Sequence, residues 1–337
     1  MSDPVIDCRD LWKVFGPAPE KMIGKSPEEI AATGHVAAVR DVSLSIGRGE
    51  MLVIMGLSGS GKSTLIRCLT RLVESTSGSI TVEGQDLLGL SDKGLIDLRR
   101  SKMGMVFQNF ALLPHRSVLE NVAFPLEMRG QSRHDRRERA LDVIRLVGLE
   151  GREDHFPREL SGGQQQRVGI ARSLAIEPDI WFLDEPFSAL DPLIRREMQD
   201  EFLRLQEMLG KTIVFITHDF DEALRLADRI AIMYEGKVEQ IDTPDRIVMN
   251  PATDYVAKFT REIAKARVVH ARALAEPLNG QALSGAPVAA SATIAELGRQ
   301  LMESTDDFLP VADGSGAVIG GLPRVRALEL LFAEGGD

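Results

Sequence analysis

The sequence predicts an α/β fold built on a sheet of buried parallel strands. Strands are predicted at SITVEG, MGMVFQ, DIWFLD, TIVFIT and RIAIMYEG. Several of these runs are short and almost wholly apolar, as buried parallel strands are. Two more runs, VAAVRDVSLSI (36–46) and MLVIM (51–55), also have strand character. MLVIM leads into the glycine-rich GLSGSGKST, after which LIRCLTRLV has the apolar spacing of a helix. Strands alternating with helices in this way are typical of α/β proteins.

Length and charge set the first limits on function. A chain of 337 residues has room for roughly two domains of about 150 residues each. The formal net charge is −10, with acidic and basic residues interspersed, which argues against a protein that binds nucleic acid through a basic face. The two cysteines, Cys8 and Cys68, have no CxxC spacing, so we expect neither a zinc site nor a disulfide framework. Two cysteines without a disulfide framework fit a protein from a reducing compartment.

The sequence contains no segment suited to membrane insertion or export. No apolar run approaches the roughly 18 to 20 residues that a membrane-spanning helix needs, and the acidic start MSDPVID is unlike a signal peptide. We therefore expect a cytoplasmic protein, whose role at a membrane would depend on a partner.

A phosphate-binding loop is predicted at residues 56–63. GLSGSGKS matches the pattern GxxxxGK[ST] in full and lies between a strand and a helix, which disfavours a chance glycine turn. Backbone N–H groups of such a loop wrap the phosphates, Lys62 reaches the β and γ oxygens, and the Ser63 hydroxyl holds Mg²⁺. The predicted nucleotide-binding residues here are Gly56, Ser58, Gly59, Ser60, Gly61, Lys62, Ser63 and Thr64.

Two adjacent carboxylates follow another apolar strand. IWFL (180–183) ends in Asp184 and Glu185. Such a pair at a strand end is often only a solvated loop start, but the phosphate loop gives it a function. Asp184 would complete the Mg²⁺ shell, and Glu185 would orient or deprotonate the attacking water.

The stretch LSGGQQQRVGIARSL (160–174) predicts a second anion site. A serine and two glycines precede a helical apolar pattern, so the loop presents backbone N–H groups at a helix N-terminus. The stretch itself supplies no phosphate.

Taken together, these residues resemble the nucleotide-binding cassette of ABC transporters, a P-loop NTPase with a RecA-like core and a helical subdomain. The resemblance covers Val5 to about Phe259. Six motifs occur in family order: the Walker A loop, Gln108 in VFQNF, the signature LSGGQ, the Walker B segment that ends at Asp184 and Glu185, the D-loop from Ser188 to Asp191, and His218 in FITHD.

The resemblance implies how these residues divide the work. Ser161, Gly162, Gly163 and Gln164 of the signature contact the γ-phosphate of ATP held by the other subunit, so the working unit is a homodimer of cassettes around two ATP molecules. Glu185, His218 and Gln108 form the catalytic set, and Ser63, Gln108 and Asp184 the Mg²⁺ set. His218 could instead be a core histidine and Gln108 a turn residue. The adenine is expected to stack on Phe15, with Trp12 as the reserve.

An insertion narrows the resemblance further. FGPAPEKMIGKSPEEIAATGH (15–35) separates the first aromatic from the next strand and, with the long motif runs, looks like the ATPase subunit of glycine betaine, choline and proline betaine importers, the quaternary amine uptake family. Importers of trimethylamine N-oxide or histidine remain alternatives. The expected partners are integral membrane permease subunits and a periplasmic or extracellular substrate-binding protein, and the expected place is the cytoplasmic face of the inner (plasma) membrane, where the chain is peripheral.

Two other functional classes are disfavoured. A non-transport ABC ATPase acting on nucleic acid or ribosomes would need a long coiled-coil insertion, zinc cysteines or a second cassette, and the sequence contains none of these. A purely regulatory nucleotide-binding module would lack Glu185 or Lys62, and both are present.

The expected domain organisation is a cassette over 1–262, with its helical subdomain at about 109–176, then a linker over 263–290 and a small module over 291–337. The linker assignment depends on the Ala-, Gly- and Pro-rich composition. The tail has a capping-box pair, Thr293 and Glu296, two strands around DGSG, and a helix beginning at Pro323. It resembles a single CBS-like module, whereas many members of the family carry two, and we expect a regulatory or oligomeric role for it.

Overall fold

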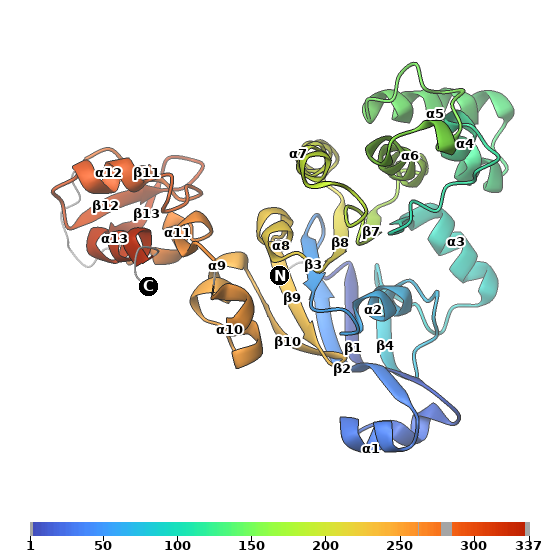
Figure 1. Cartoon of the computed structure of the whole chain (residues 1–337), viewed down its shortest axis with the longest axis horizontal. Helices are drawn as coiled ribbons and strands as arrows, with labels where there is room; N and C mark the ends of the chain where they lie inside the picture. Colours follow the sequence, from blue (N-terminus) through green and yellow to red (C-terminus); the bar gives the residue numbers. More distant parts are fainter. Residues whose placement is uncertain (1–2, 262, 278–284, 334–337) are drawn as a thin grey trace. The chain divides into compact units, whose positions relative to one another are not determined.

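The computed structural model of the chain describes residues 3–261, 263–277 and 285–333. The chain divides into two compact units, of which the first ends at Val238 and the second begins at Glu239 (Figure 1). This division falls earlier than the boundary expected at 262/263. Among the described residues, no helix combines the length and the apolar character needed to cross a membrane.

A six-stranded sheet, five of whose strands lie wholly within the first unit, confirms the predicted fold class. Its order is β10-β9-β3-β8-β7-β6. Strand β3 pairs in parallel with β8 and β9, and β7 pairs in parallel with β6 and β8. Every residue of β3, β7 and β8 is buried, which explains their apolar sequences. The strands are β3 (Met51–Met55), β6 (Met103–Val106), β7 (Ile180–Asp184), β8 (Thr212–Thr217), β9 (Arg229–Tyr234) and β10 (Lys237–Asp242).

A second, antiparallel sheet has the order β2-β1-β4-β5. Its strands are β1 (Ile6–Phe15), β2 (Val36–Ile46), β4 (Ser77–Val82) and β5 (Gln85–Asp86). The insertion between β1 and β2 contains the short helices η1 (Pro19–Met22) and α1 (Pro27–Ala32). The other helices outside the helical segment are α2 (Lys62–Leu69), α3 (Asp92–Lys102), α7 (Pro192–Leu209) and α8 (Phe220–Leu226).

Three mutually packed helices occupy the expected helical subdomain, together with the short η2 (Pro157–Glu159). They are α4 (Val118–Met128), α5 (Arg133–Leu146) and α6 (Gly162–Leu174). Asn121 on α4 fixes the loop that leads from β6 into this segment. Its buried side-chain amide accepts a hydrogen bond from the Leu113 N–H at 2.8 Å and donates to the Leu113 carbonyl at 3.1 Å. The amide therefore satisfies backbone groups that burial would otherwise leave unpaired.

The second unit contains a small three-stranded sheet of order β11-β12-β13. Strand β12 pairs in parallel with β11 and antiparallel with β13. The two predicted strands and the helix after Pro323 are confirmed. Thr293 and Glu296 form the expected reciprocal hydrogen bonds, but the helix that follows begins only at Gly298, with Leu297 as its N-cap residue. The elements are α9 (Pro244–Met249), α10 (Asp254–Thr260), η3 (Lys265–Arg267), α11 (Ala271–Leu274), β11 (Val288–Ala289), α12 (Gly298–Glu303), β12 (Phe308–Ala312), β13 (Val318–Pro323) and α13 (Arg324–Phe332).

The linker expected over 263–290 is wrong for the residues that can be described there. This range contains η3, α11 and β11, and its residues Ala266, Val269, Ala271, Leu274 and Val288 belong to the apolar core of the second unit. Residues 278–284 lie outside the described part of the chain. The composition suggested a linker because alanine and glycine are common in both loops and small packed interfaces, and only the packing distinguishes the two.

Leu274→Ala should therefore destabilise the second unit. Leu274 is 3% exposed, and truncation of a buried leucine costs about 2–5 kcal/mol. Arg267→Ala is the control, because Arg267 is exposed on the neighbouring η3. Differential scanning calorimetry of both full-length variants measures the effect. Equal unfolding temperatures for Leu274→Ala and Arg267→Ala would show that this range behaves as a linker after all.

Candidate functional site

The predicted phosphate loop follows β3 and ends at α2. Two of its glycines are required by their conformation and surroundings. Gly56 has φ 152° and Gly61 has φ 100°, and a Cβ would overlap the carbonyl oxygen of Met233 at the first and of Ala38 at the second. Gly61 is also the N-cap residue of α2. The loop therefore turns sharply enough to direct its backbone N–H groups to the start of the helix, where an anion binds favourably.

Lys62 is the first residue of α2 and is buried. Its Nζ donates hydrogen bonds to the carbonyl oxygens of Gly56 at 2.7 Å and Leu57 at 3.0 Å. Burial lowers the pKa of the Lys62 ammonium, whereas the charges of Glu185 and Asp184 oppose this shift. The carbonyls hold the ammonium beside the loop, where it can reach phosphate oxygens.

Ser63 and Asp184 form the next part of the site. The Ser63 hydroxyl donates to Asp184 Oδ1 at 2.9 Å, which joins the start of α2 to the end of β7. Burial raises the pKa of Asp184, while the hydrogen bond from Ser63 lowers it. A hydroxyl and a carboxylate are oxygen ligands of the kind that Mg²⁺ prefers, so this pair fits the metal role predicted for it.

Glu185 contacts the other two catalytic candidates, Gln108 and His218. Gln108 Nε2 donates to Glu185 Oε2 at 3.2 Å, and His218 Nδ1 lies 3.1 Å from the same oxygen. Glu185 itself has φ 47°, a left-handed conformation that is uncommon for a residue with a side chain. Ser188 helps to hold it, because the Ser188 hydroxyl donates to the Glu185 carbonyl at 2.9 Å. Both side-chain contacts use Oε2.

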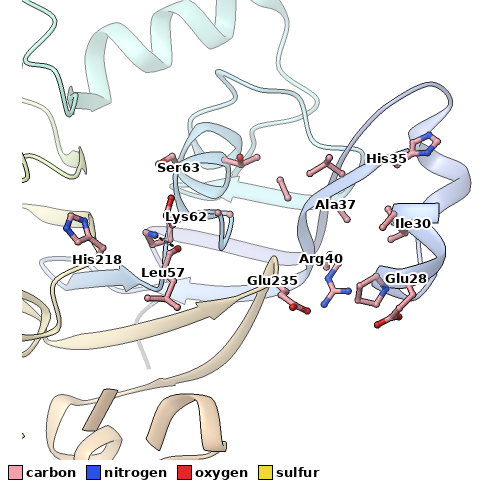
Figure 2. Close-up of a pocket in the computed structure, with 18 of the residues that line it drawn as sticks. Glu28, Ile30, His35, Ala37, Arg40, Leu57, Lys62, Ser63, His218 and Glu235 are labelled. Atoms are coloured by element: carbon pink, nitrogen blue, oxygen red, sulfur yellow. Dashed lines mark hydrogen bonds between the residues drawn. The ribbon is translucent and has the colours of Figure 1, made fainter. Parts of the chain in front are cut away.

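These residues surround one cavity of about 1030 Å³ (Figure 2). A cavity of this size is large enough for a whole nucleotide. Of the site residues expected from the sequence, those that line it are Ser58, Gly59, Gly61, Lys62, Ser63, Thr64, Gln108, Glu185 and His218. Gly56 and Ser60 of the loop and Asp184 at the end of β7 are buried and are not among the lining residues.

The signature residues do not line this cavity, although the structure describes all of them. Ser161 is the N-cap residue of α6: its hydroxyl accepts from Gln164 N–H at 3.3 Å, and Gln164 Oε1 accepts from Ser161 N–H at 3.0 Å. Ser161 and Gly162 are exposed, whereas Gly163 is buried against Ile194. One chain therefore presents a phosphate loop and a separate, exposed helix N-terminus.

The two aromatic candidates for the base differ in their surroundings. Trp12 is only 8% exposed and packs with Val14, Met22 and Ile30, so it is a core residue. Phe15 at the end of β1 is 44% exposed, lies beneath Lys13 Nζ, and does not line the cavity. Stacking of the base on Phe15 stays a prediction.

Sequence reasoning missed the other wall of the cavity. It is formed by the insertion and by the first residues of β2, together with Glu235, and its members are Pro27, Glu28, Ile30, Ala31, His35, Val36, Ala37, Ala38 and Arg40. One local signal was available, because Ser26 and Glu29 have capping-box spacing, and their reciprocal hydrogen bonds begin α1. Nothing in the local pattern shows that α1 reaches the cavity.

Comparison with known proteins agrees with this geometry. Residues 39–188 match the family described as ABC transporter. The trimethylamine N-oxide transport system ATP-binding protein of Ruegeria pomeroyi is 70% identical over 337 residues, and the match covers 98% of each chain. This chain belongs to the ABC transporter family. The glycine betaine/proline betaine transport system ATP-binding protein of Escherichia coli is 52% identical over 276 residues, which cover 80% of this chain and 69% of the relative.

Solved ABC cassettes share the fold. One, a dimer in a post-hydrolysis state bound to ADP and Pi, is 36% identical with a TM-score of 0.60, and the match covers 71% of this chain and 98% of that one. Another, from Clostridium perfringens, is part of an ABC transporter complex; it is 28% identical with a TM-score of 0.63, and the match covers 74% of this chain and 93% of that one. The chain is thus an ATP-binding subunit of the quaternary amine uptake family and a transport ATPase, as the sequence predicted.

Glu185→Gln in this ABC subunit should retain ATP binding but lose turnover. The amide keeps the size and the hydrogen bonds of the side chain but cannot accept a proton from water, and loss of a general base costs about 100-fold or more in rate. Glu207→Gln is the control, because Glu207 is exposed on α7. Phosphate release and ATP affinity are measured on the purified proteins. Hydrolysis by Glu185→Gln within about twofold of wild type would reject Glu185 as the base.

Proposed function

We propose that two copies of this chain bind two ATP molecules between them and that hydrolysis powers uptake of a small methylated amine through a separate membrane permease. The observation that carries this proposal is the separation of two anion-binding elements in one chain. The loop of Gly56 to Ser63 lines the cavity, whereas the N-terminus of α6 does not. A second copy placed head to tail brings its α6 N-terminus to the open side of the bound γ-phosphate.

Within each site, the residues have distinct tasks. Lys62 and the loop N–H groups bind the β- and γ-phosphates. Ser63, Asp184 and Gln108 are proposed to hold Mg²⁺, which neutralises charge on the phosphate oxygens when bound. Glu185 accepts a proton from the attacking water, and its hydrogen bonds with Gln108 and His218 set the direction of the carboxylate. His218 is further proposed to reach the γ-phosphate once ATP is present.

The partners follow from this role. An ABC cassette works with membrane permease components, and the loop after Gln108 together with α4 is the proposed contact surface for them. Delivery by a periplasmic or extracellular binding protein, and a peripheral position on the cytoplasmic face of the inner membrane, belong to the same proposal. The second unit is proposed to be a CBS-like module with a regulatory or oligomeric role.

Ser161→Arg should leave ATP binding by the single chain nearly intact but abolish ATP-driven dimerisation. The longer side chain occupies the space that the other subunit's γ-phosphate needs. Ser132→Arg is a matched control, since Ser132 is the exposed N-cap residue of α5 and its hydroxyl accepts from Asp135 N–H at 3.1 Å. Each change removes one cap, at a cost of about 1 kcal/mol.

The oligomeric state is measured by size-exclusion chromatography with light scattering. Both arginine variants also carry Glu185→Gln, so that the added ATP is not hydrolysed during the run. We expect dimers for Ser132→Arg and monomers for Ser161→Arg. An ATP-dependent dimer of Ser161→Arg would contradict a site shared between two chains.

Two solutes deserve the first tests. The relative from Ruegeria pomeroyi and a second one from Pelagibacter ubique, 54% identical over 339 residues with 99% of each chain covered, both bear the name of a trimethylamine N-oxide transport system. The Escherichia coli relative named for glycine betaine and proline betaine is matched over 69% of its length. The relatives that match along the whole chain support trimethylamine N-oxide as the first candidate. The relative that matches over part of its length supports glycine betaine as the second.

The solute is tested by ATP hydrolysis in the complex reconstituted with its permease and binding protein. Trimethylamine N-oxide should stimulate hydrolysis, glycine betaine should do so less or not at all, and histidine should have no effect. The complex carrying Glu185→Gln gives the background rate. Stimulation by histidine while trimethylamine N-oxide, glycine betaine and choline all fail would overturn the methylated amine and leave only an ABC importer.

A further inference from the structure

The insertion between β1 and β2 is a closed, folded element. His35 joins its two ends, since His35 Nε2 lies 2.8 Å from the Pro17 carbonyl and Nδ1 lies 2.8 Å from Thr33 Oγ1. Gly16 has φ 136°, and any Cβ there would overlap the His35 ring. Met22 and Ile30 from the insertion pack with Trp12 of β1. The insertion is therefore held against the sheet by apolar contacts and by its own hydrogen bonds.

This element forms one end of the nucleotide cavity. Figure 2 shows Glu28, Ile30 and His35 on the side away from Lys62, Ser63 and His218. Because Lys62 and Ser63 mark the phosphate end, the sugar and base of a bound nucleotide extend toward the insertion. A cavity of about 1030 Å³ with two such ends exceeds what phosphates alone require.

Arg40 of β2 lies between these two ends and has an unusual environment. It is only 6% exposed, and its Nε is buried without a hydrogen-bond partner among the described residues. Its backbone N–H donates to the Gly236 carbonyl at 2.7 Å, which places Arg40 beside Glu235. Glu235 and Glu28 line the same part of the cavity (Figure 2), yet within the described residues neither forms an ion pair with Arg40 inside 4.0 Å.

A buried guanidinium nitrogen without a hydrogen-bond partner is costly, because burial removes its water and nothing else replaces it. Arginine offers only donors and a flat cationic face, so its ligand must supply oxygen or ring-nitrogen acceptors, or an aromatic face. Ribose oxygens and a purine base supply all of these. A phosphate would also suit arginine, but the phosphates belong at the loop end, with Lys62.

We propose that Arg40 binds the sugar and base of the nucleotide, and that α1 of the insertion closes this end of the pocket. Arg40 is thus a specificity-determining residue for the nucleoside, in addition to any stacking by Phe15. This inference rests on the proposed function, since it takes the cavity to be the ATP site.

The test compares ligands with and without a nucleoside. Affinities of the wild-type chain and of Arg40→Met for ADP and for tripolyphosphate are measured by calorimetry. Methionine keeps much of the side-chain length but offers no donors. Arg40→Met should weaken ADP binding about tenfold or more, as for loss of a charged hydrogen bond, and leave tripolyphosphate binding within about twofold. The KM for ATP should rise with little change in kcat, because the contact persists through the reaction.

Arg48→Met is the matched control, since Arg48 is an exposed arginine paired with Glu83. Equal weakening of ADP and tripolyphosphate by Arg40→Met, or no weakening of ADP, would overturn the role of Arg40 and leave the ATPase proposal intact. Failure of the wild-type chain to bind either ligand would instead overturn the proposed function.

A measurement on the unmodified chain tests the role of α1 independently of any variant. Amide hydrogen exchange over 26–35 should slow when ADP is added and should not respond to tripolyphosphate. An unchanged rate with saturating ADP would show that the insertion does not close the pocket.

Discussion

The site depends on the close packing of three backbone segments: the phosphate loop, the start of β2 and the turn after β9. Gly236 in that turn donates its N–H to the Ser60 carbonyl at 3.0 Å and accepts from Arg40 N–H at 2.7 Å. Gly61 faces the Ala38 carbonyl so closely that no side chain fits between them. The curvature of the loop, and with it the position of Lys62 and Ser63, is set by these contacts.

Strand order brings the catalytic side chains to the same place. Strands β3, β8, β7 and β6 are parallel neighbours, so their carboxyl ends share one edge of the sheet. Lys62 begins α2 after the loop that follows β3, and His218 follows β8. Asp184 ends β7 and Glu185 comes directly after it, while Gln108 follows β6. Glu185 receives contacts from both flanking strands because it stands between them. The helical segment inserted after β6 displaces none of these neighbours and carries the signature helix, whose N-terminus does not line the cavity.

Much of this site could be predicted from the sequence, because each motif is short and its chemistry is local. The phosphate loop, the Asp184–Glu185 pair and the capped start of α6 require only a few adjacent residues of the right type, and each has the predicted conformation. The same holds for apolar strands such as β3 and β8, whose predicted bounds match the structure. By contrast, no element was predicted within the insertion, although Ser26 and Glu29 begin a helix there. The residues of 263–277 resembled a linker but contribute to a core.

The sequence by itself thus determined the fold class, the order of the motifs and the local conformation of the phosphate loop and of the start of α6, since backbone conformation at those positions depends on near neighbours. Only the tertiary structure decided which distant segments meet. It placed Trp12 in the core with Met22 and Ile30, put α1 at one end of the cavity, and left Arg40 Nε buried without a hydrogen-bond partner among the described residues. Burial and the pairing of charges are properties of contacts between segments far apart in the chain, and no local pattern of residues contains them.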